Sequence, residues 1–386
     1  MRPALFSKKF PWWAVAILLT LAGGCSTPVT DPTPAIRVAL HAVQEQFAPD
    51  RHLTIFDVSV RREGDQFVLE GNVDNPAARQ AAIAAAKQTG ARVRDQITLL
   101  PARKLGDRVW GIATVSVLNV REKPGHISEL GTQILSGDVF RILNAQTNWF
   151  LVQSSDHYVG WVEGGGFMAG NAGMVQQWND SPRLIVTAFE ERILEQPDAE
   201  AAPVSDVVMG GVVQRVGEND EWDKVRLADG RTGYLPKKSV ADFEEWRTTR
   251  RATPANIERT ARSFLGRPYF WGGNSIRGLD CSGLTKLSFF LNGVALPRNA
   301  SEQCHEGVEV PLDDNYAHLK KGDLLFFGHR AIASTPEKIV HTGLYLGDKK
   351  FIQSAGMVRI SSLDPTSPLR DEHRIKTLLH ARRILP

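Results

Sequence analysis

The chain contains an internal repeat whose two copies align without a gap, at one constant offset. Each copy has short apolar runs separated by turn residues such as Pro-Gly, Ser-Gly-Asp and Asp-Gly, a pattern typical of a small β-barrel of five or so strands. The repeat therefore predicts two similar barrels in series, over residues 106–170 and 181–242. The matching pairs are Glu122/Glu195, Pro124/Pro197, Gly137/Gly210, Val139/Val212, Trp149/Trp222, Val152/Val225, Asp156/Asp229, Gly160/Gly233 and Trp161/Tyr234.

Length and composition narrow the class of protein. A chain of 386 residues suggests two or three folded units at roughly 150 residues per domain, and 42% hydrophobic with 23% charged residues is ordinary for a globular protein. This excludes a fibrous, disordered or multi-span membrane protein. Because the net charge is only +3, there is no large field of one sign to hold a polyanion, and nucleic acid is not expected as a partner.

The N-terminus has the pattern of an export signal over residues 1–24. Basic residues precede an apolar run at positions 12–21, and small residues follow it. The run is about half the ~20 residues that a membrane-spanning helix needs, so a cleaved secretory signal is the better interpretation. Residues 25–36, rich in Thr, Ser and Pro, are predicted to form a flexible tether.

Cys25 directly follows the small residues, which resembles the bacterial lipoprotein signal. The resemblance implies that Cys25 is acylated and anchors the protein to the cell envelope. Ser26, in place of Asp, implies the outer membrane, whereas Ala22 stands where that signal usually has Leu. The alternative is an ordinary exported protein whose cysteine is unmodified.

Residues 37–102 predict a small α+β module. Apolar residues alternate from Thr54 to Val73 around a turn at Glu63-Gly64-Asp65, which indicates a hairpin. A helix is expected over 77–88, started by Asn75-Pro76, and a strand over 93–99. The order loosely resembles BON-type envelope modules. The alternative is a spacer without a specific function.

Both copies of the repeat resemble bacterial SH3-like domains. The first copy carries Leu118-Asn119-Val120-Arg121, Trp149 and Gly160-Trp161-Val162, whereas the second has Arg192-Ile193-Leu194-Glu195 in place of the first run and diverges more. The resemblance implies either binding of wall peptides or packing against a catalytic partner, and packing is the preferred interpretation.

Cys281 is the candidate nucleophile. It follows a Gly-rich stretch and precedes an amphipathic run with Leu284, Leu287 and Leu291 on one face, so it should open a helix. The unpaired N–H groups and the positive dipole end of a helix N-terminus favour a thiolate, which nucleophilic catalysis by cysteine needs.

His341 is the candidate base, with His329 as the rival. The run 340–346, a turn at Gly347-Asp348-Lys349 and the run 351–354 predict a hairpin. If the loop is those three residues, His341 and Gln353 lie on the same face of neighbouring strands, two positions apart, and the amide can orient the imidazole. Cysteine, histidine and an orienting polar group make a nucleophile triad.

Residues 255–386 resemble the NlpC-type cell-wall peptidases, a papain-like group of bacterial cysteine hydrolases with an α+β fold. The resemblance implies a catalytic domain over 252–386 in which Cys281 is the nucleophile, His341 the base and Gln353 the third polar residue, a place where many relatives have His. No metal or cofactor is implied. The motifs are Tyr269-Phe270-Trp271-Gly272-Gly273, Asp280-Cys281-Ser282-Gly283, Leu296-Pro297-Arg298 and Lys321-Gly322-Asp323-Leu324.

The same resemblance adds neighbours of the nucleophile. Tyr269 looks like the family tyrosine whose hydroxyl lies beside it, and the backbone N–H of Cys281 or Ser282 would help to hold the oxyanion. Asp280 belongs to the same motif, and Trp271 is either a cleft wall or a core residue.

Cys304 and His305 form a second cysteine–histidine pair. Adjacent residues on a strand or helix point apart, and no motif surrounds them. Cys304 is therefore predicted to be a passive thiol.

The domain order resembles NlpC-type enzymes that cut the bond between γ-D-glutamate and a diamino acid in wall stem peptides. Some of these close the cleft with the first barrel and bind a free L-alanine amine through an acidic residue. Asn299 stands at that position and lacks the charge, so Glu122 is the proposed carboxylate and Tyr158 a proposed wall. The rivals are an envelope scaffold or peptidoglycan-binding protein with a silent papain-like domain, and an enzyme acting on another amide or ester. The sequence makes no prediction of oligomeric state.

Overall fold

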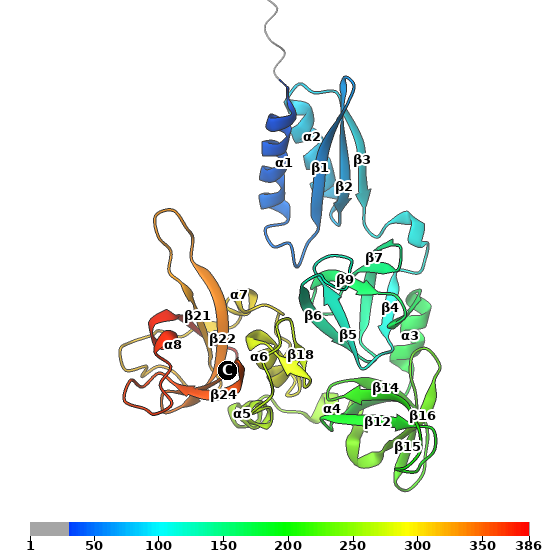
Figure 1. Cartoon of the computed structure of the whole chain (residues 1–386), viewed down its shortest axis with the longest axis vertical. Helices are drawn as coiled ribbons and strands as arrows, with labels where there is room; N and C mark the ends of the chain where they lie inside the picture. The colour runs from blue at the N-terminus through cyan, green and yellow to red at the C-terminus, as the bar shows by residue number, and fades with distance from the viewer. Residues whose placement is uncertain (1–30, 386) are drawn as a thin grey trace, which may run out of the picture.

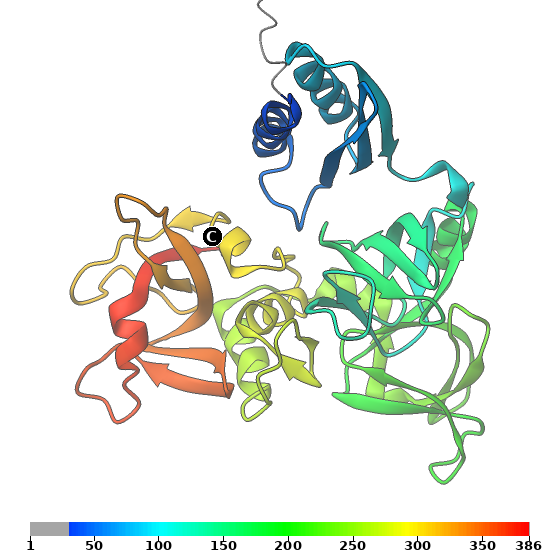
Figure 2. The same ribbon diagram turned by 45° about the horizontal axis from the view of Figure 1, so that its top comes forward.

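The structure, a computed structural model, describes residues 31–385. The expected signal peptide and residues 25–30 of the expected tether, Cys25 among them, lie outside the described residues. Figures 1 and 2 show an N-terminal module above two barrels and a C-terminal domain that lie side by side. No helix within residues 31–385 is long and apolar enough to cross a membrane.

The N-terminal module is a three-stranded sheet covered by two helices. Strand β2 pairs antiparallel with β1 and parallel with β3, as the predicted hairpin, helix and strand require. The helices bury alanines and aliphatic residues against the sheet. The elements are α1 (Thr33–Phe47), β1 (Phe56–Glu63), β2 (Gln66–Val73), α2 (Pro76–Gln88) and β3 (Val93–Leu99).

Helix α1 corrects the expected tether, which was extended to residue 36. The helix begins at Thr33, and Pro34 is tolerated because first-turn N–H groups have no intrahelical acceptor. Ile36, Leu40 and Val43 follow helical spacing and are buried. The Pro and Thr residues of this stretch suggested a flexible tether, whereas the apolar face that begins at Ile36 makes it the start of a helix.

The two barrels have the same strand order, although each sheet has seven strands rather than the expected five or so. The first sheet runs β10-β4-β7-β8-β9-β5-β6, and the second runs β17-β11-β14-β15-β16-β12-β13. The starts of β4 and β11, at Trp110 and Arg183, are related by the same offset as the matching residues of the repeat, and so are the starts of β10 and β17, at Phe167 and Val240. The repeat is therefore a repeat of topology as well as of residues.

The strands of the first barrel are β4 (Trp110–Ala113), β5 (Val117–Arg121), β6 (Leu130–Leu135), β7 (Val139–Gln146), β8 (Trp149–Gln153), β9 (Val159–Glu163) and β10 (Phe167–Gly170). Those of the second are β11 (Arg183–Val186), β12 (Glu190–Leu194), β13 (Pro203–Val208), β14 (Val212–Glu218), β15 (Trp222–Arg226), β16 (Thr232–Pro236) and β17 (Val240–Asp242). Helix α3 (Ala172–Asp180) joins the barrels, and Trp178 donates its indole N–H to the carbonyl of Gly137 at 3.1 Å.

The C-terminal domain packs helices against a six-stranded sheet of order β20-β25-β21-β22-β23-β24. Helix α6 contacts β22 and β23, which brings the segment after Cys281 against the hairpin that carries His341. Helix α4 (Phe243–Thr249) contacts β11 and β17 of the second barrel and connects it to this domain. The elements of the domain are α5 (Pro254–Ser263), β18 (Asn274–Ser275), β19 (Gly278–Leu279), α6 (Cys281–Phe290), α7 (Ala300–Gln303), β20 (Val308–Glu309), β21 (Leu324–His329), β22 (Lys338–Gly347), β23 (Lys350–Ala355), β24 (Met357–Ser362), α8 (Glu372–Thr377) and β25 (Leu378–Arg383).

The β22–β23 hairpin has a shorter loop than expected and the expected register. Only Asp348 and Lys349 form the turn, both at positive φ, and an irregularity between Tyr345 and Gly347 absorbs the remaining residue. Leu344 pairs with Ile352. Continuing this register puts Gln353 two positions from the residue opposite His341, on the same face.

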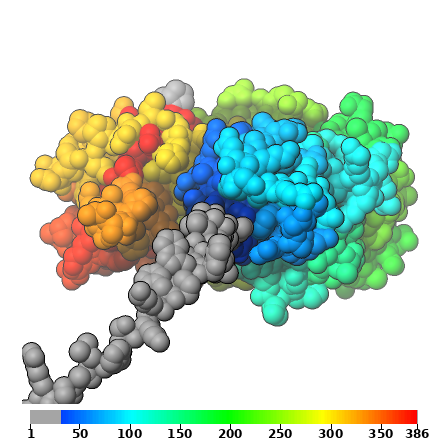
Figure 3. Space-filling model, turned by 90° about the horizontal axis from the view of Figure 1, so that it is seen from above, coloured from blue at the N-terminus to red at the C-terminus, as the bar shows by residue number. Residues whose placement is uncertain are grey.

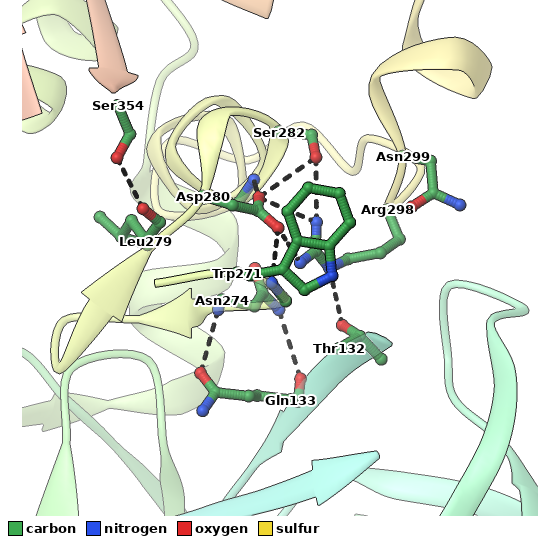
Figure 4. Close-up of polar contacts among 12 residues, drawn as sticks. Thr132, Gln133, Trp271, Asn274, Leu279, Asp280, Ser282, Arg298, Asn299 and Ser354 are labelled. Carbon is green, nitrogen blue, oxygen red and sulfur yellow. Dashed lines mark hydrogen bonds and ion pairs between the residues drawn. The ribbon is translucent and has the colours of Figure 1, made fainter. Parts of the chain in front are cut away.

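The first barrel is joined to the catalytic domain by buried polar contacts (Figure 4). Gln133 on β6 accepts a hydrogen bond from the backbone N–H of Asn274 at 3.0 Å. It also accepts one from the hydroxyl of Ser275 at 3.1 Å. Leu135 of the first barrel and Val208 of the second belong to the hydrophobic core of the catalytic domain. The barrels are therefore packed parts of the site's framework.

Candidate active site

Cys281 is the first residue of α6 and lies at the wall of a cavity of about 330 Å³. Asp280 caps the helix by accepting from the N–H of Gly283 at 2.7 Å, and its other oxygen accepts from the N–H of Gly272 at 3.1 Å. Cys281 as a whole residue is 8% exposed. The helix start thus holds the sulfur in a fixed, nearly buried place.

Burial changes the expected ionisation of this thiol. Burial, and then the nearby charge of Asp280, raises the pKa of Cys281 to about 11, although the N–H groups of Thr342 and Ser282 lower it. The sequence-based expectation of a thiolate at a helix N-terminus considered the stabilising N–H groups and omitted desolvation. The resting group is a thiol, so attack requires a base that takes its proton.

His341 on β22 is 5% exposed and is held by Gln353. The distance from His341 Nε2 to Gln353 Oε1 is 2.7 Å. An amide oxygen can only accept, so Nε2 carries the proton and donates it to this bond. Nδ1 of the neutral ring then has a free lone pair and can serve as the base.

The Gln353 amide is fixed by partners on both of its atoms. Its Nε2 donates to Ser361 Oγ at 2.8 Å and to Asp371 Oδ2 at 2.9 Å, and Arg374 Nε donates to its Oε1 at 3.1 Å. A flipped amide would set its NH2 group against the Arg374 N–H, donor against donor, and its oxygen against the Asp371 carboxylate, acceptor against acceptor. The Gln353 amide oxygen is therefore a fixed hydrogen-bond acceptor. The sequence predicted this role for Gln353 but not the partners that fix the amide.

Asp371 and Arg374 are residues that sequence reasoning missed. Asp371 caps the short helix α8, and Arg374 lies within that helix, far along the chain from the catalytic motifs. The one local signal that could have drawn attention to them is the N-cap residue Asp371, and an N-cap points to a helix start rather than to a site.

The imidazole is neutral under ordinary conditions. Burial, followed by the positive charge of Arg374, lowers the pKa of His341 to about 3, while the Gln353 hydrogen bond and Asp371 oppose this shift. The N–H of Thr342, the residue after His341 on β22, hydrogen-bonds the Cys281 sulfur. A neutral imidazole on this strand is competent to act as a general base toward a neutral thiol as attack proceeds.

Asp280 and Ser282 belong to a buried network around Arg298 (Figure 4). Arg298 donates to Asp280 Oδ2 at 2.5 Å, to Ser282 Oγ at 2.9 Å and, across the domain boundary, to Thr132 Oγ1 of the first barrel at 2.9 Å. The Ser282 side chain therefore has a structural partner. Within residues 31–385, the first-turn N–H groups of Cys281 and Ser282 donate to no oxygen, and they can donate to an oxyanion.

Tyr269 and Trp271 line the same cavity as Cys281. Burial, and then the charges of Cys281 and Asp280, raises the pKa of Tyr269, so its hydroxyl stays protonated. Trp271 is 60% exposed, and its indole N–H donates to Glu129 Oε1 of the first barrel at 2.8 Å. Of the two interpretations of Trp271, the structure has the cleft wall.

Glu122, Tyr158 and Asn299 also line this cavity. Tyr158 donates its hydroxyl to Glu122 Oε1 at 2.8 Å. Hydrogen bonding from His52 contributes most to lowering the pKa of Glu122, so its carboxyl is ionised. The Asn299 amide donates to Glu302 Oε1 at 2.7 Å, within the cap of α7.

Three residues that the sequence weighed lie elsewhere. Cys304 is buried in the hydrophobic core, in keeping with a passive thiol, and His305 beside it is exposed. His329, the rival base, is exposed at the end of β21, whereas His341 is buried and held by Gln353.

Arg51 and His52, from the segment between α1 and β1, line the cavity and were not expected there. The segment belongs to the N-terminal module, and both barrels separate it from Cys281 along the chain. No motif near these residues signalled a role.

Three family models match the chain. The NlpC/P60 family matches residues 266–383, the bacterial SH3 domain residues 116–167, and the BON-like domain residues 58–101. These matches confirm the predicted α+β fold with its papain-like catalytic domain, SH3-like domain and BON-like module.

Several curated relatives are similar over long stretches. Dipeptidyl-peptidase 6 of Lysinibacillus sphaericus is 29% identical over 67% of this chain and 93% of its own. The gamma-D-glutamyl-L-lysine dipeptidyl-peptidase of Bacillus cereus is 27% identical over 67% of this chain and 76% of its own. A probable endopeptidase NlpC homolog of Haemophilus influenzae is 32% identical over 45% of this chain and 85% of its own.

A solved structure shares the fold across several domains. An NlpC/P60 family protein from Bacillus cereus superposes with a TM-score of 0.61 at 22% identity, covering 72% of this chain and all of that one. The matched domains, the relatives and the Cys281–His341 site agree. The chain belongs to the NlpC/P60 family and is a cysteine peptidase that carries bacterial SH3 and BON-like domains ahead of its catalytic domain.

Proposed function

We propose that the protein is a peptidoglycan hydrolase that cleaves the amide between γ-D-glutamate and the diamino acid of stem peptides, and that it selects peptides with a free N-terminal amine. The proposal rests on one observation: Cys281 and the ionised Glu122 of the first barrel line the same cavity. Two relatives whose names describe dipeptidyl-peptidases, one of them specific for γ-D-glutamyl-L-lysine, support it.

The reaction is an acyl transfer. His341 Nδ1 takes the thiol proton as Cys281 Sγ attacks the γ-carbonyl of D-glutamate, and the N–H groups of Cys281 and Ser282 stabilise the oxyanion. The amide C–N bond breaks, and His341 returns the proton to the leaving amine. His341 then deprotonates a water molecule that hydrolyses the thioester, releasing the dipeptide acid and the free thiol.

Glu122 supplies the contact for the other end of the dipeptide. Its carboxylate is one-fifth exposed and remains ionised, and Tyr158 holds one of its oxygens. An ammonium group at this place gains a charge-assisted hydrogen bond in a partly desolvated cavity. An N-acylated peptide, such as one still joined to glycan, has no charge to offer.

Glu122→Gln tests this selection. With L-Ala-γ-D-Glu-diaminopimelate as substrate, we expect kcat/KM to fall roughly 10- to 100-fold, because one charge-assisted contact is lost. Products are measured by mass spectrometry, in parallel with the N-acetylated tripeptide, on which the variant and wild type should be equal.

Glu163→Gln is the matched control, since Glu163 is an exposed glutamate of the same barrel and is not part of the cavity wall. Equal loss on both substrates would contradict amine selection. If the folded wild type does not cleave the tripeptide, the substrate class proposed here is refuted. Cleavage of intact walls would then favour a wall endopeptidase, and no cleavage of walls would favour an envelope scaffold.

The pH profile tests the electrostatic role of Arg374. Charged or titratable groups near His341 include Arg374, Asp371 and His373, and Arg374 is the main one that disfavours the imidazolium. Arg374→Gln should therefore raise the pKa of His341 and move the acidic limb of the kcat/KM profile upward by about one pH unit. Arg359→Gln is the control, because Arg359 is half exposed and contacts the same Asp371. An unchanged limb in Arg374→Gln would contradict the assignment.

Anchoring through Cys25 and an outer-membrane location remain predictions of the sequence. They suit an enzyme that meets wall peptides in the envelope, and mass spectrometry of the mature N-terminus would test them.

A further inference from the structure

The segment that joins α1 to β1 forms part of the catalytic cavity. Arg51 and His52 line it together with Glu122 and Tyr158 of the first barrel and Cys281 of the catalytic domain. Seen from above, the N-terminal module lies between the catalytic domain and the barrels (Figure 3). Three separate domains therefore contribute walls to one site.

His52 is fixed on the first barrel by its backbone and by its ring. Its carbonyl accepts from the N–H of Val159 at 2.7 Å, and the carbonyl of the next residue, Leu53, accepts from Gln153 Nε2 at 3.2 Å. The imidazole stacks on the Tyr158 ring with centroids 5.3 Å apart and 22° between the planes. The segment is thus docked where Tyr158 approaches Glu122.

Three acidic side chains lie near His52, those of Asp50, Glu122 and Glu302. Its Nδ1 lies 3.2 Å from Asp50 Oδ1, and its Nε2 lies 3.5 Å from Glu122 Oε1. These two carboxylates raise the pKa of His52 to about 9, so it is an imidazolium at neutral pH. A carboxylate oxygen of Glu302 lies within 4.8 Å of ligand atoms of both Asp50 and His52, and Arg51 contacts Glu122.

The two oxygens of Glu122 have different surroundings. Oε1 accepts a hydrogen bond from the Tyr158 hydroxyl and lies next to the His52 ring, and both of these side chains are at least partly buried. Oε2 lies 3.4 Å from Arg51, whose side chain is 74% exposed and free to move into solvent. An exposed ion pair of this kind contributes little, so Oε2 is the oxygen available to an incoming ammonium.

We propose that the BON-like module completes the substrate site and that His52 is a positioning residue, which holds Oε1 of Glu122 so that Oε2 faces the N-terminal ammonium of the peptide. The inference rests on the proposed function and gives the N-terminal module a role in it. Specificity for free peptides would then depend on a segment outside both the catalytic domain and the barrel.

The test uses residues 26–386, which lack the signal and Cys25, with His52→Ala and His52→Gln. For the free-amine tripeptide, His52→Ala should raise KM roughly tenfold with kcat within about twofold of wild type, because the binding contact is misplaced and the chemistry is not. KM for the N-acetylated tripeptide should not change. His52→Gln retains a side-chain donor toward Glu122 and should recover part of the loss.

His41→Ala is the matched control, since His41 is an exposed histidine of the same module that pairs only with Glu45 among the described residues. A KM ratio between the two substrates that is unchanged in both His52 variants would overturn the inference while leaving the proposed function intact. Equal losses on both substrates would also overturn it, by indicating a structural role. If the wild type cleaves neither peptide, the proposed function itself fails.

Discussion

Replacing Cys281 with serine is expected to lower kcat for tripeptide hydrolysis by at least about 10⁴-fold while the protein stays folded. The buried site offers one base, His341, which is held neutral by burial and Arg374 and is too weak to deprotonate an ordinary alcohol efficiently. The measurement is single-turnover hydrolysis with circular dichroism to verify the fold.

Cys304→Ala is the matched control, because Cys304 is the other buried thiol of the catalytic domain and lies in its hydrophobic core. It should keep the activity of the wild type within a fewfold. Iodoacetamide should modify Cys281 and abolish activity at the same rate. Activity that survives in Cys281→Ser, or that is lost in folded Cys304→Ala, would contradict the assignment of the nucleophile.

Arg298→Met is expected to destabilise the catalytic domain by about 3–5 kcal/mol. The Arg298 side chain is 1% exposed, and its removal leaves the largely buried Asp280 without its ionic partner, immediately before Cys281. The contact with Thr132 is lost as well, which weakens the joint with the first barrel. We expect the transition temperature in scanning calorimetry to fall by roughly 10 °C.

Lys376→Met is the control for this prediction. It removes a similar positive charge from an exposed pair with Glu372 on the same domain, where an ion pair contributes about 0–1 kcal/mol. A similarly small fall in transition temperature in both variants would show that Arg298 is dispensable for the interface between the catalytic domain and the first barrel. Asp280→Asn in the Arg298→Met background should restore part of the stability, because the buried charge is then gone.

Local features of the sequence predicted much of the catalytic site. The start of α6 at Cys281 follows from an N-cap and an apolar helical face, and both are encoded within a few residues. The same-face relation of His341 and Gln353 follows from the period of a strand, and it held although the loop was one residue shorter, because a bulge restored the register.

The ionisation of the site could not be read from the same residues. The helix start predicted a thiolate, but desolvation depends on how many atoms from other elements surround the sulfur. Arg374, which helps to keep His341 neutral, comes from a short helix without a motif. The separation of Arg374 from His341 along the sequence gives no information about their separation in space.

The sequence by itself determined the chemistry of this protein and the repeated topology of its barrels, because a nucleophile motif, a strand period and turn residues act over short stretches. Only the tertiary structure decided which side chains from the other domains line the cavity beside Cys281. Glu122 and His52 reach the Cys281 cavity because three domains dock on one another, through contacts such as Arg298 with Thr132 and Val159 with His52. Those contacts join residues distant in the chain, and one sequence has no local pattern that records them.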